Sequence, residues 1–233
     1  MNDPCQRLIV ALDVSSAAAA QKIVAAVGDS AFCYKVGMQL FTAEGPPLVR
    51  DLVASGRKVF LDLKYHDIPN TVASAVREAA ALRVSMLTIH ASGGGKMIRA
   101  ANDAAHQAGS GLAVLAVTVL TSLGDGDLPD LGVSASAKDQ VLRLAGLALK
   151  SGCGGVVASA QEATELRLKL GKDFLIVTPG VRPADGDIGD QARVVTPAEA
   201  IAAGASCIVV GRPITGAADP GMAAREILSQ INS

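Results

Sequence analysis

The sequence predicts an α/β protein, a single-domain (β/α)8 barrel of the TIM type that spans residues 1–233. Three observations lead to this prediction. Short apolar runs recur eight times, segments rich in Ala and Leu separate them, and polar residues close several of the runs. Strands buried on both faces of a parallel sheet read as continuous hydrophobic runs, and eight strand-helix units are what a closed barrel requires.

The eight apolar runs are spaced as strands that are joined by helices would be. We expect strands at residues 8–12, 32–37, 58–63, 85–90, 112–118, 153–158, 174–178 and 206–211.

The segments between these runs have helical patterns, with a start signal at Ser15 and a stop signal at Gly28. We expect helices at residues 15–27, 45–55, 71–82, 96–108, 135–150, 161–170, 197–203 and 220–231. An open doubly wound sheet is the alternative, but it usually has a glycine-rich turn after its first strand. Residues 13–15 contain no glycine, and we therefore favour the barrel.

Composition argues against several classes of function. Half of the residues are hydrophobic, the net charge is −1 without any basic run, and only 3% are aromatic with no Trp, so nucleic acid is not an expected partner. The longest apolar stretch, residues 111–120, is about half of the ~20 residues that a membrane span needs, so we do not expect a membrane protein.

The cysteines and the N-terminus indicate where the chain works. Four cysteines lie far apart without a CxxC pair, which is typical of reduced thiols in the cytoplasm. The early apolar run ends at Asp13, and no basic segment or cleavage pattern surrounds it, so we expect no signal peptide.

Charged residues lie at the predicted strand ends, where barrels of this type carry their catalytic groups. Asp13 closes the first strand, Lys35 lies in the second, and Asp62 and Lys64 end the third. Side chains alternate along a strand, so Asp62 and Lys64 should share the inward face, with Leu61 and Leu63 facing the helices. Buried charge is seldom retained for stability alone, which favours a catalytic network over an ion pair that only plugs the barrel.

For other polar residues near these strands, the evidence for a catalytic role is weaker. Asp13 taken alone could cap the helix that follows it. Asp67 follows the third strand and can reach sideways, to a neighbouring subunit. We interpret His90 as structural and His66 as a residue beside the charged cluster that does not share its face.

The loops after the seventh and eighth strands fit a phosphate site, which barrels often build there from backbone N–H groups and a helix N-terminus. The first of these loops carries Gly180 and Arg182, and the second carries Gly211 and Arg212. Residues 183–191 are rich in Gly and Asp, and we expect them to form a lid from which Gln191 reaches the phosphate.

The run from Asp62 to Thr71, DLKYHDIPNT, resembles the signature of the orotidine 5′-monophosphate decarboxylase family. Its DxKxxD core continues into Ile, Pro and a spaced Thr, and the resemblance extends over nearly the whole chain. It implies cofactor-free decarboxylation of orotidylate to uridylate, without a metal, by a homodimer with shared active sites.

The resemblance also implies a role for each site residue. Lys64 would protonate the sixth carbon of the pyrimidine, Asp62 would lie against the departing carboxylate, and Lys35 would link Asp62 to the ribose. The remaining implied contacts are Asp13 to a ribose hydroxyl, Asp67 and Thr71 to the neighbour's site, Thr121 and Ser122 to the base, and Arg182, Gln191, Gly211 and Arg212 to the phosphate.

The chemistry suits this set independently, because decarboxylation leaves a localised carbanion that needs a cation able to give up a proton. Lysine can do both, whereas arginine hardly donates. Two other functions remain open. One is a metal-dependent decarboxylase or aldolase of the same barrel type acting on a sugar phosphate, and the other is a nucleotide-binding sensor without turnover, against which the intact Lys64 argues.

Overall fold

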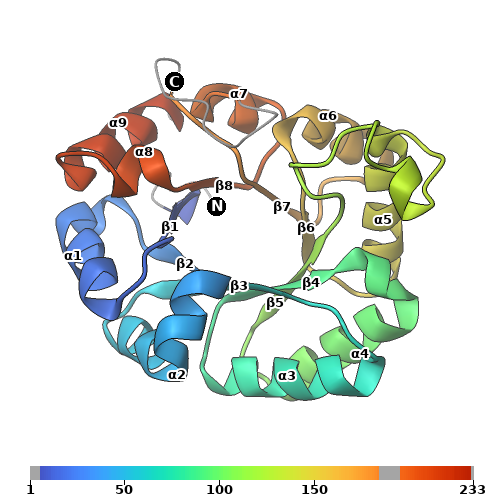
Figure 1. Cartoon of the computed structure of the whole chain (residues 1–233), viewed down its shortest axis with the longest axis horizontal. Helices are drawn as coiled ribbons and strands as arrows, with labels where there is room; N and C mark the ends of the chain where they lie inside the picture. The colour runs from blue at the N-terminus through green and yellow to red at the C-terminus, as the bar shows by residue number, and fades with distance from the viewer. Residues whose placement is uncertain (1–5, 184–194, 232–233) are drawn as a thin grey trace.

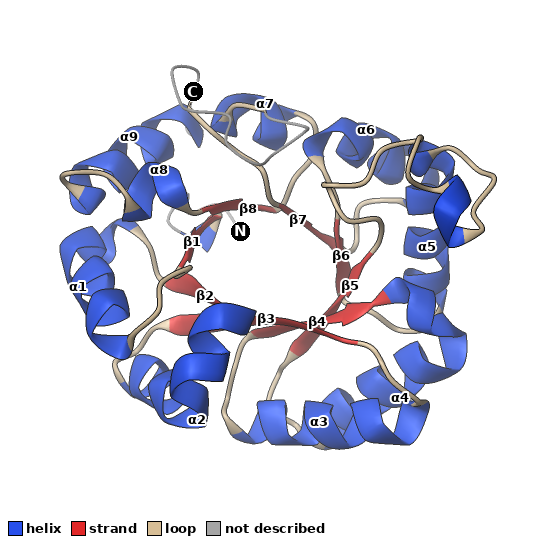
Figure 2. Ribbon diagram, in the orientation of Figure 1, coloured by secondary structure: helices blue, strands red, loops and turns tan. Residues whose placement is uncertain are grey.

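The computed structural model describes residues 6–183 and 195–231 of the 233-residue chain. Eight parallel strands close into a barrel in the order β1 to β8, each paired with its neighbours in sequence, and β1 pairs with β8. Helices form an outer ring around these strands (Figures 1 and 2). The predicted (β/α)8 barrel is confirmed.

The strands agree with the predicted apolar runs, apart from their ends. They are β1 (Leu8–Ala11), β2 (Cys33–Gly37), β3 (Lys58–Tyr65), β4 (Met86–His90), β5 (Ala113–Val117), β6 (Gly155–Val157), β7 (Leu175–Thr178) and β8 (Cys207–Val210).

The α-helices follow the strands in turn. They are α1 (Ala17–Val27), α2 (Met38–Ala54), α3 (Pro69–Ala81), α4 (Gly94–Gln107), α5 (Ala137–Lys150), α6 (Ala160–Leu170), α7 (Pro197–Ala202), α8 (Arg212–Thr215) and α9 (Pro220–Ile231). Short 3-10 turns lie at η2 (Gly28–Ser30), η3 (Ala91–Gly93) and η4 (Pro129–Leu131).

The prediction that a helix begins at residue 45 is wrong, because α2 begins at Met38. Gly45 has a φ of 64° and a ψ of −159°, which kinks the helix just before Pro46 and Pro47. Glycine and proline signals such as these mark helix starts as well as kinks. From the sequence alone, the Gly and Pro residues at the kink therefore indicate the start of the helix, and its first part, before Gly45, is not predicted.

Two apolar cores hold the barrel together. The larger one lies between the strands and the surrounding helices, and Leu61 belongs to it while Leu63 packs against it, as predicted. The smaller one fills the barrel interior with side chains that include Ile9, Phe60 and Leu115. In the described part of the chain, no helix is both long and apolar enough to cross a membrane.

Candidate active site

Four charged side chains meet at the carboxyl-terminal end of the barrel. Asp13 follows β1, Lys35 lies in β2, and Asp62 and Lys64 lie near the end of β3. The Lys35 ammonium is 2.7 Å from Asp13 Oδ1 and 3.9 Å from Asp62 Oδ2, and the Lys64 ammonium is 2.9 Å from Asp62 Oδ1. The structure thus brings together the residues predicted to form an alternating network, and two carboxylates balance two ammonium groups.

Most of this network is shielded from water. The side chains of Lys35, Asp62 and Lys64 are 11%, 15% and 24% exposed, whereas that of Asp13 is 56% exposed. Charges shielded from water interact more strongly than exposed ones, so the inner three act in a medium of lowered dielectric constant.

An irregularity in β3 presents Lys64 to the barrel interior. Leu61 pairs with Leu87 of β4 and Tyr65 pairs with Ile89, so three residues of β3 face one residue of β4. Lys64 lies in this bulge with a φ of 53°. A left-handed backbone is unfavourable for a residue with a Cβ atom, and such strain concentrates at functional sites.

A cavity of about 160 Å³ adjoins the network, and Lys35, Asp62 and Lys64 line it together with Thr121. Its apolar wall is formed by Phe60, Val117, Val119, Leu120, Val157, Ala158, Pro179 and Val209. The apolar layer below already fills the barrel. A plug of ion pairs is therefore not needed there, and the charges instead face a space that can hold a ligand.

A second cavity of about 440 Å³ continues from the first and shares Lys35, Pro179 and Val209 with it. Ala11, Asp13, Gly180, Arg182, Gly211 and Arg212 complete its lining. Arg182 is buried and donates from Nη1 to the Val181 carbonyl at 3.0 Å, whereas Arg212 begins α8 and is exposed. The loops after β7 and β8 thus bring both predicted phosphate-binding arginines to one cavity.

Other predicted site residues lie elsewhere in this single chain. Asp67 and Thr71 are exposed, and neither is among the described residues that line the two cavities. Asp67 accepts a hydrogen bond from the Ile68 backbone N–H at 2.6 Å. Ser122 is exposed, beside Thr121 but outside the lining. Gln191 and most of the predicted lid lie outside the described residues.

The two histidines near the network pair with each other. The rings of His66 and His90 lie 5.4 Å apart, and His90 is half-buried at the end of β4. Burial lowers the pKa of His90, and the positive charges of His66 and Lys64 lower it further. Neither histidine lines the two cavities in the described structure, which agrees with the structural interpretation of His90.

Sequence reasoning missed two residues that support the network. A Cβ atom at Gly37 would lie 2.9 Å from Lys35 Nζ and 3.2 Å from Asp13 Oδ1, so only glycine leaves this ion pair its room. Thr88 is fully buried, and its hydroxyl bonds both Asp62 and Lys64. A buried threonine in a strand looks like any β-branched residue, and no sequence signal distinguished it.

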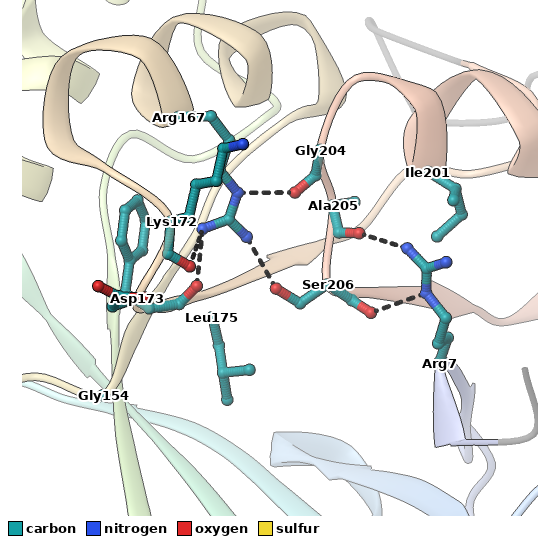
Figure 3. A pocket seen from close by; sticks show the side chains of 11 residues that line it. Arg7, Gly154, Arg167, Lys172, Asp173, Leu175, Ile201, Gly204, Ala205 and Ser206 are labelled. Carbon is teal, nitrogen blue, oxygen red and sulfur yellow. Dashed lines mark hydrogen bonds between the residues drawn. The ribbon is translucent and has the colours of Figure 1, made fainter. Parts of the chain in front are cut away.

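A further cavity, of about 630 Å³, is lined by residues that directly precede β1, β7 and β8, so it lies at the amino-terminal end of the barrel. Figure 3 shows the side chains around it. Arg167 donates to the carbonyls of Gly204, Lys172 and Phe174 and to the Ser206 hydroxyl, at 2.8–3.3 Å. Arg7 donates to the carbonyls of Ala205 and Ser206. These arginines tie loop backbones together, a role that fits the stability-bearing face of such barrels.

The four charged groups of the network pair with one another. Both Asp13 and Asp62 already contact lysine ammonium groups. Among residues 6–183 and 195–231, no cluster of three or more His, Cys, Asp and Glu side chains could hold a metal ion.

Comparison with known proteins places the chain in a family. A model of the Orotidine 5'-phosphate decarboxylase / HUMPS family matches residues 6–227. Curated relatives named orotidine 5'-phosphate decarboxylase include one from Idiomarina loihiensis, 51% identical with 97% of each chain covered, and one from Vibrio cholerae, 48% identical with 99% of this chain and 100% of the relative covered. A crystal structure of orotidine 5'-phosphate decarboxylase from Lactobacillus acidophilus superposes with a TM-score of 0.86 at 40% identity, over 98% of this chain and all of the other. The chain therefore belongs to the orotidine 5′-phosphate decarboxylase / HUMPS family.

Proposed function

We propose that residues 1–233 act as one catalytic domain that decarboxylates orotidine 5′-monophosphate to uridine 5′-monophosphate and CO2, the last step of de novo UMP synthesis. The observation that carries this proposal is the Lys64 ammonium, held 2.9 Å from Asp62 in a cavity that continues to Arg182 and Arg212. A reacting ring and a remote phosphate can be bound together only where such groups share one connected space.

The proposed reaction uses Lys64 as the proton donor. The bond between the sixth ring carbon and the carboxylate breaks, CO2 leaves, and the electron pair remains on the ring carbon. A proton moves from the Lys64 ammonium to that carbon, and the resulting amine then regains a proton from water. An ammonium next to the carbon stabilises the developing negative charge before it gives up the proton.

Asp62 and Lys35 orient this donor. The Asp62 carboxylate fixes Lys64 Nζ and would lie against the departing carboxylate, while Lys35 bridges Asp62 and Asp13. Asp13 is the most exposed member of the network and borders both Lys35 and the second cavity, where it can accept from a ribose hydroxyl. Thr121 and the neighbouring Ser122 would contact the base.

The network alone does not account for catalysis. Two unit charges about 4 Å apart interact by roughly 4 kcal/mol at an effective dielectric constant of 20, whereas enzymes lower barriers by roughly 8–23 kcal/mol. Binding energy from the phosphate must therefore be used at the transition state. Arg182, Gly211 and Arg212 border the cavity where this phosphate would lie, and we propose that Gln191 joins them.

A metal-dependent decarboxylase or aldolase acting on a sugar phosphate is the alternative within the same family of barrels. The curated relatives named above favour orotidylate, because they match this chain over nearly its full length. The ion pairs of Asp13 and Asp62 also favour it, since a metal site would need these carboxylates for its ligands.

The test is to mix purified, chelator-treated protein with orotidylate and to follow the pyrimidine absorbance. We expect full turnover without added metal or cofactor. Parallel reactions supply a sugar phosphate with and without Mg²⁺. Turnover of the sugar phosphate that depends on Mg²⁺, with an unchanged orotidylate spectrum, would select the alternative.

We propose further that two chains form a homodimer in which Asp67 and Thr71 complete the neighbour's site. Both residues are exposed and lie apart from the cavities of their own chain. Ile68 and Met38, on the same end of the barrel, are 67% and 57% exposed, and large exposed apolar side chains of this kind favour a protein contact.

Mixing two inactive variants tests the shared site. Lys64→Ala and Asp67→Ala chains, unfolded and refolded together, would form mixed dimers with one intact site, and random pairing restores about a quarter of wild-type activity. Activity that does not rise above that of either variant alone would contradict the shared site.

The cytoplasm is the proposed location, because the cysteines are suited to a reducing compartment. Cys33, Cys153 and Cys207 are free and buried. Burial raises the pKa of Cys33 to about 12 and those of Cys153 and Cys207 to about 11, so the thiols stay protonated and unreactive. Thiol titration of unfolded protein from the native host should therefore find these three cysteines as free thiols. If they were oxidised, the titration would detect three thiols fewer than the four cysteines of the sequence.

A further inference from the structure

The side chain of Thr88 contacts both partners of the ion pair between Asp62 and Lys64. It is the third residue of β4 and is fully buried. Side chains alternate along a strand, so it shares the inward face with Met86, which belongs to the core inside the barrel. Its hydroxyl lies 2.9 Å from Asp62 Oδ1 and 2.9 Å from the backbone nitrogen of Lys64.

The direction of both hydrogen bonds follows from chemistry. A backbone N–H can only donate, so the Thr88 oxygen accepts from Lys64. An ionised carboxylate can only accept, so the Thr88 hydroxyl donates to Asp62. One hydroxyl has one proton and two lone pairs, which means that this pair of bonds fixes its orientation.

The bulge in β3 explains why such a side chain is needed. Asp62, Leu63 and Lys64 together face Thr88, because the register shifts between Leu61 and Tyr65. A bulge takes its extra residues out of the regular ladder, and a backbone N–H without a ladder partner must find another acceptor. The Thr88 hydroxyl supplies that acceptor for Lys64, whose φ is 53°.

We infer that Thr88 is a positioning residue that holds Lys64 and Asp62 in the geometry for proton transfer. It touches no atom that reacts, and it acts through the other two residues. Threonine suits this role because its β-branched side chain has few rotamers, so the hydroxyl stays in place without substrate. The inference rests on the proposed function for its kinetic consequence, but its structural consequence can be measured separately.

The kinetic test compares Thr88→Val with Thr118→Val. Thr118 is a matched control, since it is also a buried threonine, directly after β5, and its hydroxyl donates to the Val157 carbonyl. We expect Thr88→Val to lower kcat for orotidylate by about 10- to 100-fold, as small misplacements of reacting groups do. Affinity for uridylate, measured by calorimetry, should change by less than about twofold, because the phosphate contacts remain.

Thr88→Ser and Thr88→Cys provide a second pair in case the valine variant does not fold. They differ by one atom, but a thiol is a much weaker hydrogen-bonding group than a hydroxyl. Serine should restore most of kcat, while cysteine should stay about tenfold below it. Equal kcat values for these two variants, or a loss in Thr88→Val no larger than in Thr118→Val, would overturn the inference.

Hydrogen exchange at the Lys64 amide measures the structural consequence. We expect exchange to be faster in Thr88→Cys than in Thr88→Ser, and unchanged in Thr118→Val. Unchanged exchange in Thr88→Cys would also overturn the inference. If wild-type protein did not decarboxylate orotidylate, the proposed function would fail, while the exchange result would still decide the role of Thr88.

Discussion

The two ends of the barrel both carry basic side chains, but they use the charges differently. At the carboxyl-terminal end, Lys35 and Lys64 contact carboxylates at 2.7–2.9 Å. At the amino-terminal end, Arg7 and Arg167 donate to neutral backbone carbonyls and the Ser206 hydroxyl (Figure 3). The two lysines are bound by carboxylates and line a cavity, whereas the two arginines are bound by carbonyls and connect separate loops. The partner of each basic side chain therefore distinguishes residues that can act on a ligand from residues that stabilise the fold.

Cavity size does not identify the site in this molecule. The amino-terminal cavity has a volume of about 630 Å³ and is larger than either cavity at the other end, at about 160 and 440 Å³. We place the active site in the smaller pair because strained backbone, buried ion pairs and strand ends coincide there.

Among these variants, Lys64→Ala should cause the largest change in activity. We expect kcat to fall by about 10⁴-fold or more, because the variant loses both the cation and the proton donor. Uridylate should still bind, since the second cavity is unchanged. Stopped assays would measure kcat, and calorimetry would measure uridylate binding as the control. A kcat within tenfold of wild type would contradict the proposed mechanism.

Arg212→Ala should weaken binding rather than chemistry. One charge-assisted contact contributes about 1.5–3 kcal/mol, so affinity for uridylate should fall by about 10- to 100-fold. Affinity for uridine, which lacks the phosphate, should be nearly unchanged. If calorimetry found the same loss for both ligands, Arg212 would not be a phosphate contact.

Gly37→Ala tests whether the ion pair needs its space. A Cβ atom would displace Lys35 Nζ, and we expect kcat/KM to fall by about tenfold with little change in thermal midpoint. Gly146→Ala is the matched control, because its Cβ would meet only Leu170 at an ordinary 3.8 Å in helix α5. Equal activity of the two variants would contradict a role for Gly37 in making room for the ion pair.

Arg167→Met should show the opposite behaviour from the variants at the carboxyl-terminal end. The variant loses four hydrogen bonds and the contact of the guanidinium with the Phe174 ring at 4.7 Å. We expect the free energy of unfolding to fall by about 2–4 kcal/mol, with kcat within about twofold of wild type at a temperature where the variant is folded. A large loss of kcat in folded protein would contradict a purely structural role.

The smallest expected effect is a pH dependence at His90. Its pKa is lowered in the folded chain, mainly by burial, with His66 and Lys64 lowering it and Asp62 opposing them. The stability that its neutral form allows is therefore present above the ordinary value near 6.5 and is lost as the pH falls through the folded pKa. His90→Gln should flatten the fall in thermal midpoint between about pH 7 and pH 5. An identical slope in both proteins would argue against this contribution.

The sequence predicts the barrel and much of the network because both depend on local patterns. Continuous apolar runs mark buried parallel strands, and the polar residues that end them cluster once the barrel closes. The spacing of Asp62 and Lys64 correctly places both on the inward side. Contacts between distant segments are harder to predict, because the bulge that gives Thr88 its role arises only when β3 pairs with β4. The same holds for Gly37, whose missing side chain matters only beside Lys35 and Asp13.

Proton NMR of orotidylate mixed with chelator-treated protein tests the central claim most directly. Decarboxylation replaces the carboxylate at the sixth ring carbon with a proton, so a new signal from that proton should appear and grow with time in the wild-type reaction and stay absent with Lys64→Ala. A wild-type reaction in which orotidylate persists and no such signal appears would contradict the assignment of the carboxyl-terminal network to this reaction.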